Sequence, residues 1–405
     1  MILVKKITFI HAADLHLDSP FKGLRKLPEE LLQQIKDSTF ESLQKIIDEA
    51  ITREVDFVLF SGDLYDGENR NLRTQVKFRK EMERLKQHDI QVYIIHGNHD
   101  HLGGKWISIE QPSNVHIFSG QAEVKEFKKG DSVTYIYGYS YPTQHVNQSI
   151  VDKYVKKPGA DYHIGMLHGS VEGQSEHSRY APFTVDELVQ KAFDYWALGH
   201  IHKRQELVSS PPIIYPGNIQ GRHKKESGMK GCYYVKLQGK QAQLEFVPTS
   251  AVVWDSISVS LDENDSFDNL LIKCRAQMEN IRKDSCGMLV EIKLNHCSDF
   301  MMYENFQHDL LEILQEEEEY KQHFVYPYAI AIAETVVSDS SHPILELING
   351  YEWTEQDVFE AIQPLYKHSL GRKYISELSS EEKKQLIEEA KQMLAMLLTR
   401  GGNER

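Results

Sequence analysis

The 405-residue sequence contains few cysteines and no long hydrophobic run. Its four cysteines, Cys232, Cys274, Cys286 and Cys297, form no CxxC pair, so we expect free thiols in a reducing compartment. No apolar stretch approaches the roughly 20 residues that a membrane-spanning helix needs. The N-terminal stretch MILVKKITFIHAADLHL lacks the apolar core and the cleavage site of a secretion signal. We therefore expect a cytoplasmic protein that does not use a membrane.

An excess of positive charge is also missing. The chain has 46 Lys and Arg against 60 Asp and Glu, a net charge of −14. Taken alone, this charge argues against a nucleic-acid partner, because phosphate binding needs positive potential. Residues 1–250 nevertheless carry 32 basic and 31 acidic side chains, whereas residues 251–405 carry 14 and 29. The acidity lies in the C-terminal part and does not exclude a phosphate-bearing ligand in the N-terminal part.

The composition is that of a soluble globular protein, with 40% hydrophobic and 26% charged residues. The length predicts two or three domains. The sequence pattern changes near residue 250, and from residue 341 it is helical throughout. We therefore predict one domain over 1–250, a second over 251–340 and a C-terminal helical segment over 341–405.

The first 250 residues alternate short apolar runs with amphipathic stretches. We predict buried strands at 7–12, 55–60, 92–95, 162–167 and 195–198. Two predicted helices, Glu29–Arg53 and Leu72–His88, separate the first three strands, which indicates a parallel α/β arrangement. After residue 200 come shorter apolar runs at 213–215, 232–237 and 244–247. These runs suggest a second, more antiparallel sheet that closes the same domain.

The second predicted domain has the order strand, helix, strand, helix, strand, which indicates a small α+β fold. Its strands are expected at 253–261, 288–295 and 328–337, and its helices at 267–281 and 303–319. In the C-terminal segment, Ser379 and Glu382 have the spacing of a capping box. The helix that follows carries an apolar stripe, which includes Leu386, Ile387, Leu394, Leu397 and Leu398.

Five polar clusters directly follow five of the predicted strands. They are Asp14-Leu15-His16, Gly62-Asp63-Leu64-Tyr65-Asp66, Gly97-Asn98-His99-Asp100-His101, His168-Gly169 and Gly199-His200-Ile201-His202. In open α/β sheets, ligands bind beyond the carboxyl ends of the strands, so the clusters should meet in one place. Imidazole and carboxylate groups together suit Mn, Fe, Zn or Ni better than Ca or Mg alone.

These residue types suggest a two-metal hydrolytic site. The carboxylate of Asp63 can bridge two ions, and two ions roughly 3.5–4 Å apart can hold a hydroxide between them and act on a phosphoryl group. The leaving oxygen then needs a proton donor. His99 is the candidate general acid, and Asp100 beside it could orient the imidazole and raise its pKa.

The ordered motifs DxH, GDxxD, GNHD, HG and GHxH resemble those of the calcineurin-like metallophosphoesterase superfamily over about residues 7–250. The resemblance implies a two-sheet sandwich flanked by helices, which holds two divalent ions. Mn²⁺ is expected, with Fe, Ni, Zn and Mg as alternatives. It also implies that His99 is the catalytic histidine. One ion would be held by Asp14, His16, Asp63 and His202, and the other by Asp63, Asn98, His168 and His200.

Within the superfamily, three segments resemble the SbcD-type DNA-repair exonucleases, and most of all their YhaO-like bacterial branch. The segments are IHAADLHLDSP, SGDLYD and GHIHKRQ with the following YPGNIQGRHKKESGMKGCYYV. This resemblance implies a cap domain and an SbcC-like SMC-type ATPase as partner, and it also allows a homodimer. Asp66 stands where some members have a second histidine, with a proposed role in positioning the DNA phosphate. Asp66 is therefore the candidate residue for positioning the substrate, and the endonuclease activity of those members stays open for this chain.

Three surface features each have two interpretations. Basic residues near the predicted site either contact DNA phosphates or belong to a solvated loop; they are Lys203, Arg204, Arg222, Lys224, Lys225 and Lys230. Tyr137, Tyr139 and Tyr141 either stack on a frayed base or are half-buried strand residues. The apolar stripe of the C-terminal segment either docks on the ATPase or packs on the chain's own cap.

The sequence thus favours a dinuclear-metal phosphodiesterase that acts on DNA as an exonuclease. Two alternatives stay open. The chain could hydrolyse a small nucleotide or phosphorylated metabolite, or it could be a non-catalytic scaffold that binds DNA or the ATPase.

Overall fold

The structure is a computed structural model. It describes residues 5–66 except 18 and 20–26, 71–173 except 106 and 108, and 180–332 except 263, 297–299, 301, 302, 304, 319, 320 and 322. Beyond these it describes residues 347, 350, 351, 353–367, 378, 380, 383, 384, 386–388, 390 and 391. The chain divides into two compact units, Met1–Ile332 and Ala333–Arg405. The division into three parts stays a prediction.

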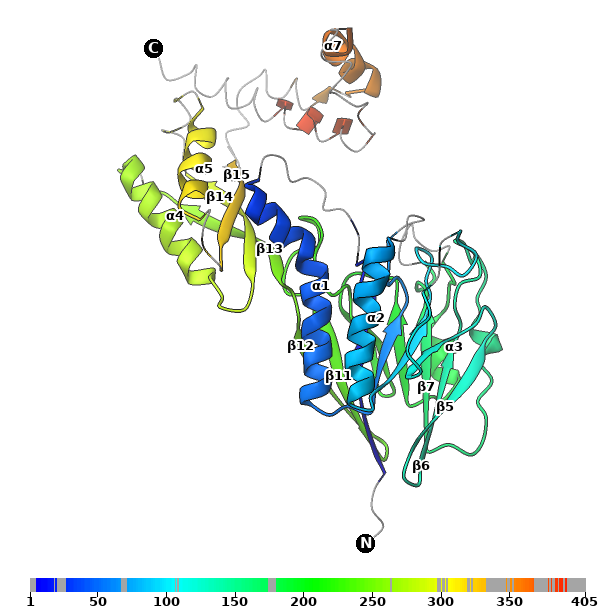
Figure 1. The fold of residues 1–405 in the computed structure, drawn as a ribbon. Coiled ribbons are helices and arrows are strands. Elements are labelled where there is room, and N and C mark those ends of the chain that lie inside the picture. The colour runs from blue at the N-terminus through cyan, green and yellow to red at the C-terminus, as the bar shows by residue number, and fades with distance from the viewer. Residues whose placement is uncertain are drawn as a thin grey trace, which may run out of the picture. The chain divides into compact units, whose positions relative to one another are not determined.

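Two six-stranded sheets form most of the first unit (Figure 1). The first sheet contains β1 (Lys6–Ala12), β2 (Phe57–Ser61), β3 (Gln91–Ile95), β4 (Val115–Ile117), β11 (Gly231–Gln238) and β12 (Gln241–Pro248). The second contains β5 (Glu123–Lys129), β6 (Ser132–Gly138), β7 (Tyr162–His168), β8 (Tyr195–Gly199), β9 (Gln205–Ser209) and β10 (Pro212–Tyr215). Their orders are β12-β11-β1-β2-β3-β4 and β5-β6-β7-β8-β10-β9. The five strands predicted before residue 200 are confirmed as β1, β2, β3, β7 and β8.

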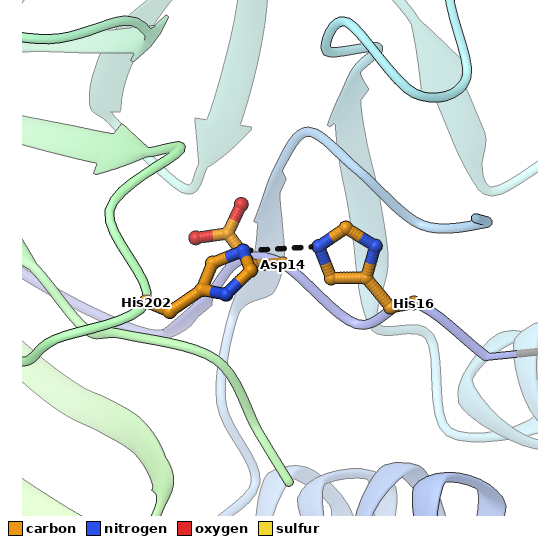
Figure 2. Close-up of side chains that lie close together, drawn as sticks. All are labelled: Asp14, His16 and His202. Carbon is orange, nitrogen blue, oxygen red and sulfur yellow. Dashed lines mark hydrogen bonds between the residues drawn. The ribbon is translucent and has the colours of Figure 1, made fainter. Parts of the chain in front are cut away.

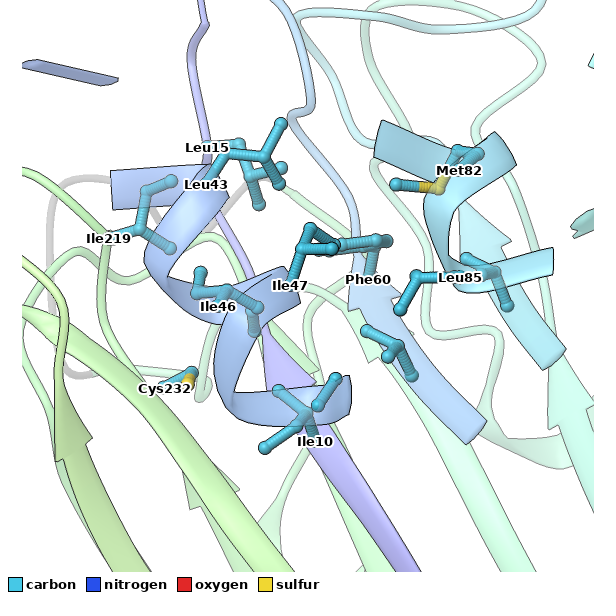
Figure 3. Packing of buried hydrophobic residues seen from close by; sticks show 14 of the residues in the cluster. Ile10, Leu15, Leu43, Ile46, Ile47, Phe60, Met82, Leu85, Ile219 and Cys232 are labelled. Atoms are coloured by element: carbon cyan, nitrogen blue, oxygen red, sulfur yellow. The ribbon is translucent and has the colours of Figure 1, made fainter. Parts of the chain in front are cut away.

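The two sheets pack face to face because their strands are apolar on both sides. Phe9 of β1 and Phe57 of β2 stack with ring centroids 5.0 Å apart, and they share one buried cluster with Met166 of β7. On the opposite face of the first sheet lie α1 (Glu29–Thr52) and α2 (Leu72–Gln87). Their apolar faces contribute residues such as Ile46 and Met82 to a second cluster (Figure 3). The structure is therefore an α/β sandwich, as the resemblance implied.

The prediction of a separate antiparallel sheet after residue 200 was wrong. β11 and β12 extend the first sheet, because β11 pairs antiparallel with β1. β10 joins the second sheet parallel to β8, and β9 pairs antiparallel with β10. The second sheet begins earlier than expected, at β5, whose sequence EVKEFKK is largely charged and only partly buried. Since β5 has no apolar run, its pattern gave no signal that a new sheet starts there.

The cap that follows is a parallel three-stranded sheet with the order β13-β14-β15. Its elements are β13 (Val252–Ser260), α4 (Phe267–Ile281), β14 (Gly287–Asn295), α5 (Phe306–Glu316) and β15 (Val325–Ile332). Alternate residues of β14 face different partners. Met288 and Val290 belong to a buried cluster with α4 and α5, whereas Leu289 packs with Ile35 of α1. The cap thus uses one face for its own helices and the other for the two-sheet sandwich.

Buried Gln220 fastens the cap to the sandwich. Its Oε1 accepts hydrogen bonds from the Ser42 hydroxyl on α1 (3.1 Å) and from the backbone N–H groups of Ala251 (2.9 Å) and Val252 (3.2 Å). Its Nε2 donates to the carbonyl oxygens of Gly221 and Val252. One amide side chain therefore joins α1, the loop before β11 and the first strand of the cap.

The second unit contains α7 (Glu355–Lys367). An apolar groove runs between this helix and the helical residues near 386–391, and its lining includes Trp353, Val358, Ile362, Leu386 and Ile387. The helical prediction for this region is confirmed at these positions. The capping-box residue Ser379 and the stripe residues Leu394, Leu397 and Leu398 lie outside the described residues. Across the described helices, none is both long and apolar enough to cross a membrane.

Replacing Gln220 with leucine should destabilise the first unit by about 3 kcal/mol, because the buried N–H groups of Ala251 and Val252 would lose their acceptor. Urea denaturation of the purified chain measures this change. The matched control is Gln243→Leu on the exposed side of β12, which should change stability by less than about 0.5 kcal/mol. Equal stability of the two variants would contradict the role given to Gln220.

Candidate metal centre

The five polar clusters meet at one edge of the sandwich, as their positions after the strands predicted. The structure brings Asp14, His16 and His202 into one group, and Asp63, His168 and His200 into another, with the ligand atoms of each group within 4.8 Å of one another. Asn98 joins the second group, because its Oδ1 lies 3.1 Å from His168 Nε2 and 3.2 Å from His200 Nδ1. All seven candidate ligands therefore lie together.

The backbone around these residues is held in an unusual conformation. Asp14, His16, Asp63 and His200 have positive φ angles of 52°, 43°, 51° and 100°. Residues other than glycine seldom adopt such backbone angles, and strain of this kind concentrates at functional sites. Two backbone hydrogen bonds fix the loops that follow β1 and β2, from Asp14 N–H to Gly62 (3.1 Å) and from His16 N–H to Asp63 (3.0 Å). The strain thus serves to aim side chains at one point.

Two glycines leave the space that these side chains fill. A Cβ atom at Gly97 would lie 2.3 Å from Asp63 Oδ1 and 2.6 Å from His168 Nε2. A Cβ atom at Gly62, whose φ is +94°, would lie 2.3 Å from His168 Nδ1. Only glycine lets the backbone pass so close to the site at these two positions.

Figure 2 shows Asp14, His16 and His202. The Nε2 atoms of the two histidine rings lie 3.2 Å apart, and the ring planes are inclined by 70°. The Nδ1 atom of His202 lies 2.6 Å from Glu226 Oε1, and a carboxylate oxygen can only accept, so Nδ1 carries the proton. The Nε2 atom of neutral His202 is then an unprotonated nitrogen directed at His16. A carboxylate behind an imidazole is a common arrangement for a histidine that binds metal.

His168 shows the same arrangement in the second group. Its Nδ1 lies 2.9 Å from the carbonyl oxygen of Ser61, so Nδ1 carries a proton and Nε2 is the nitrogen directed into the site. That Nε2 faces Asn98 Oδ1 at 3.1 Å and Asp63 Oδ2 at 3.4 Å, both of which also offer lone pairs. Burial lowers the pKa of His168, but the carboxylates of Asp63 and Asp14 outweigh it and raise the pKa to about 9.

These contacts fit a cation in each group. A divalent cation can take the place of the protons that these nitrogen and oxygen atoms share when no ion is bound. The donor set consists of imidazole, carboxylate and amide oxygen, which suits divalent first-row metals. The buried groups therefore have the composition of a dinuclear metal site, and Asp63 lies where it can serve both ions.

His99 lies at the rim of this centre, with its side chain 41% exposed. Its backbone N–H donates to Asp63 Oδ1 (3.0 Å), and its Nδ1 lies 2.9 Å from Asp66 Oδ1. The hydrogen bond to Asp66 raises the pKa of His99, although burial opposes it. The same bond holds the pKa of Asp66 well below its usual range. His99 and Asp66 thus form a charged pair at the edge of the metal groups.

Asp100 was expected to orient His99, and the structure gives that position to Asp66. The carboxylate of Asp100 is buried, where it accepts from the backbone N–H groups of Gly97 (2.7 Å) and Leu64 (3.0 Å) and lies 2.9 Å from His96 Nδ1. The reason is geometric, because neighbouring residues in this turn direct their side chains apart. Asp100 instead ties the loop that carries Asn98 to the loop that carries Asp63.

Sequence reasoning gave no role in the site to Ser19 or Glu226. The Ser19 hydroxyl donates to Asp66 Oδ2 at 2.6 Å, and Glu226 lies behind His202. Both residues stand in loops rather than directly after a strand, so their position carried no signal. Glu226 lies inside the segment that resembles the final sheet of the SbcD-type proteins, and this was the available hint.

The predicted DNA-contacting residues differ in accessibility. Lys203, Arg204, Lys224 and Lys225 are exposed, and Lys230 is half-buried. The guanidinium of Arg204 lies over the ring of Phe246, 3.9 Å from its centroid. Arg222 is only 12% exposed and contacts residues of the site.

Of the two interpretations of the three tyrosines, the structure excludes stacking on a base and supports burial, which is deeper than expected. Tyr137, Tyr139 and Tyr141 are fully buried in one apolar cluster on the outer side of the second sheet. Tyr141 supports the site from behind, because its hydroxyl donates to the carbonyl oxygen of His168 (3.0 Å).

Comparisons with known proteins agree with this geometry. The model of the family described as calcineurin-like phosphoesterase matches residues 7–204. A protein named uncharacterized metallophosphoesterase YhaO, from Bacillus subtilis (strain 168), is 39% identical over 401 residues, which cover 97% of this chain and 98% of that relative. The chain belongs to the calcineurin-like metallophosphoesterase family. The resemblance inferred from the five motifs is thereby confirmed.

More distant relatives include proteins described by their role in DNA repair. The DNA double-strand break repair protein Mre11 of Sulfurisphaera tokodaii is 26% identical over 242 residues, which cover 56% of this chain and 59% of that protein. A solved dimetal phosphatase from Danio rerio is 12% identical and covers 60% of this chain and 99% of its own, with a TM-score of 0.35. That last similarity is too low to support a statement about this metallophosphoesterase.

Asp66→Asn should lower the pKa of His99, because the carboxylate that favours the imidazolium form is lost. NMR titration of His99 in the metal-free metallophosphoesterase should then show a midpoint at lower pH than in the wild type. The control is Asp255→Asn, an exposed residue of β13, which should leave the midpoint in place. A midpoint unchanged by Asp66→Asn would contradict the pairing.

Removal of divalent ions should lower the Tm of the metallophosphoesterase. An ion that binds only the folded state stabilises it by about 2.7 kcal/mol at a concentration 100 times its Kd. Calorimetry of the chelated protein, with and without added Mn²⁺, measures this effect. Asp63→Asn should remove most of the increase, since Asp63 faces both groups. Identical Tm values for the wild type in the two conditions would refute the metal centre.

Proposed function

We propose that this metallophosphoesterase is a dinuclear-metal-dependent phosphodiesterase that acts on DNA as an exonuclease, with Mn²⁺ as its metal. One observation carries the hydrolytic part of the proposal. Two groups of buried ligand atoms lie beside a partly exposed imidazole, His99, which is paired with Asp66. Metal ligands together with a proton donor at their edge are what phosphodiester hydrolysis needs.

When bound, the two ions would supply charge stabilisation and lower the pKa of water at the site. The chain's own residues would handle the leaving group. Because Nδ1 of His99 is paired with Asp66, Nε2 is the nitrogen left to face the substrate. As the new P–O bond to the water oxygen forms and the old one breaks, the proton on Nε2 goes to the leaving oxygen. Asp66 keeps the ring charged beforehand and fixes its orientation.

DNA is supported as substrate by the charges around the site. Lys203 and Arg204 follow His202 directly, and Lys224 and Lys225 precede Glu226, which holds His202. Exposed basic side chains this close to a hydrolytic centre can hold the phosphates of a polyanion. The similarity to an Mre11 protein, described as a DNA double-strand break repair protein, supports the same substrate class.

An SbcC-like SMC-type ATPase is proposed as partner. The groove in the second unit, lined by Val358, Ile362 and Ile387 among others, supports helix-in-groove docking. A helical element of the ATPase with apolar residues at helical spacing would suit it.

One activity panel tests the proposed function. The chain is incubated with Mn²⁺, Fe²⁺, Ni²⁺ or Mg²⁺ and offered linear duplex DNA, single-stranded DNA or an aryl phosphodiester. His99→Ala should lower the rate on DNA by about 10²–10⁴-fold, the usual contribution of a general acid. The control is His308→Ala, a histidine exposed on the cap helix α5, which should keep wild-type rates.

If the chain hydrolyses none of the DNA substrates, even with the ATPase present, the nuclease proposal is wrong. Efficient turnover of small diesters alone would instead favour a small nucleotide or phosphorylated metabolite as substrate. No turnover of any diester, with the biological role kept by Asn98→Ala and His99→Ala, would favour a scaffold.

A further inference from the structure

The guanidinium of Arg222 lies between two carboxylates, Asp66 and Glu226, which contact His99 and His202 of the candidate metal centre. Arg222 lies in the loop between β10 and β11, and its guanidinium contacts residues from the loops after β1 and β2 as well as its own. With only 12% of its side chain exposed, it differs from Lys224 and Lys225 in the same loop, which face solvent.

One end of the guanidinium is directed at Asp66, the carboxylate that pairs with His99. Nη1 of Arg222 donates to the Ser19 hydroxyl oxygen at 2.8 Å and to Asp66 Oδ2 at 3.3 Å. The Ser19 hydroxyl in turn donates to the same Asp66 oxygen at 2.6 Å. The other oxygen of Asp66 is the one that lies 2.9 Å from His99 Nδ1. Arg222 and Ser19 together therefore fix the orientation of the carboxylate behind His99.

The other end lies beside His202 and Glu226, the carboxylate that contacts His202. Nη2 of Arg222 lies 3.4 Å from His202 Nδ1 and 3.7 Å from Glu226 Oε1. The Arg222 backbone N–H donates to Glu226 Oε2 at 2.8 Å. Asn218 Nδ2 also donates to Oε2, at 3.0 Å. Glu226 Oε1 is the oxygen that lies 2.6 Å from His202 Nδ1. The same arginine thus helps to fix the carboxylates behind two different imidazoles.

This geometry leaves Arg222 poorly placed to contact DNA. Nη1 is directed at Asp66, and Nη2 lies against both His202 Nδ1 and Glu226. Its Nε is buried with no hydrogen-bond partner among the described residues. A phosphate would have to displace a carboxylate from a mostly buried guanidinium, which is costly once the charges are desolvated.

We propose that Arg222 is a positioning residue, which sets His99 through Asp66 and His202 through Glu226, and that it is not a DNA-phosphate contact. The inference rests on the proposed function only in the part that concerns His99. Arginine is required at this position because a planar fork can serve two carboxylates at once, whereas the single ammonium of lysine is a compact point charge.

The proposal is tested with Arg222→Lys, Arg222→Gln, Asp66→Asn and Glu226→Gln. The first readout is the ratio of kcat values on two small diesters, each measured at saturating Mn²⁺. Bis(p-nitrophenyl) phosphate has a leaving group that departs as a stable anion, whereas the dinucleotide thymidylyl-thymidine needs a proton on its leaving oxygen. The second readout is the Mn²⁺ concentration that gives half of the maximal increase in Tm. The third is the salt dependence of KM for duplex DNA.

Both Arg222 variants should lower kcat on thymidylyl-thymidine by about 10²-fold, with much less effect on the aryl diester. They should also raise the half-saturating Mn²⁺ concentration by about 10–100-fold, as loss of support behind a metal ligand does. Asp66→Asn should reproduce mainly the first effect, and Glu226→Gln mainly the second. The salt slope of the KM for DNA should stay at its wild-type value.

The matched control is Arg282→Gln in the cap. Arg282 is 17% exposed and also pairs with two carboxylates, Glu279 and Glu318, but it lies outside the metal centre. It should leave the diester ratio and the Mn²⁺ requirement unchanged even if it lowers the Tm, which separates positioning from general stability.

Wild-type behaviour of Arg222→Lys in the first two readouts, with a salt slope reduced by about one in Arg222→Gln, would overturn the proposal in favour of a phosphate contact. Equal loss on both diesters, with unchanged Mn²⁺ binding, would also overturn it. If the wild type cleaves neither DNA nor thymidylyl-thymidine, the proposed function fails. The Mn²⁺ readout would still decide whether Arg222 acts through Glu226.

Discussion

The Nε2 atoms of His168 and His202 are held in a fixed direction into the site, and the rest of the centre depends on this orientation. Their Nδ1 atoms are committed to Ser61 and Glu226, so neither ring can turn away without losing a buried hydrogen bond. A divalent cation would meet these nitrogens together with the oxygen atoms of Asp14, Asp63 and Asn98. The positive φ angles of Asp14, Asp63 and His200 persist for the same reason, because the surrounding loops fix the donors at one point.

The loop from Asn218 to Glu226 links this centre to the cap. Gln220 is directed toward α1 and β13, whereas Arg222 and Glu226, two and six residues later, are directed toward the metal groups. The loop is therefore held from two sides by buried polar contacts. The cap is in this sense part of the frame that supports His202.

The meeting of the candidate ligands could be predicted from the sequence because each follows a short apolar strand, and parallel strands end at the same edge of a sheet. The sheet to which each strand belongs could not be predicted. The start of the second sheet lies in β5, whose alternating charged residues resemble a surface loop, and the return of β11 to β1 is a contact between distant segments. The partner of His99 was missed for a similar reason. Asp100 is adjacent in sequence, but Asp66 comes from another loop, and spacing along the chain says nothing about that approach.

The net charge of the whole chain did not indicate the ligand, but the charges of the residues at the site do. Asp14, Asp63 and Glu226 are buried, and Asp66 is partly so, which concentrates four carboxylates in a small volume. Arg222 contacts two of them, Asp66 and Glu226, and the charged form of His99 accounts for part of the rest. Asp14 and Asp63 are the carboxylates that face the two ligand groups, so the negative charge that remains lies where divalent ions would bind. Once those charges are offset, the exposed Lys203, Arg204, Lys224 and Lys225 would dominate the potential beside the site, even though the chain as a whole has a net charge of −14.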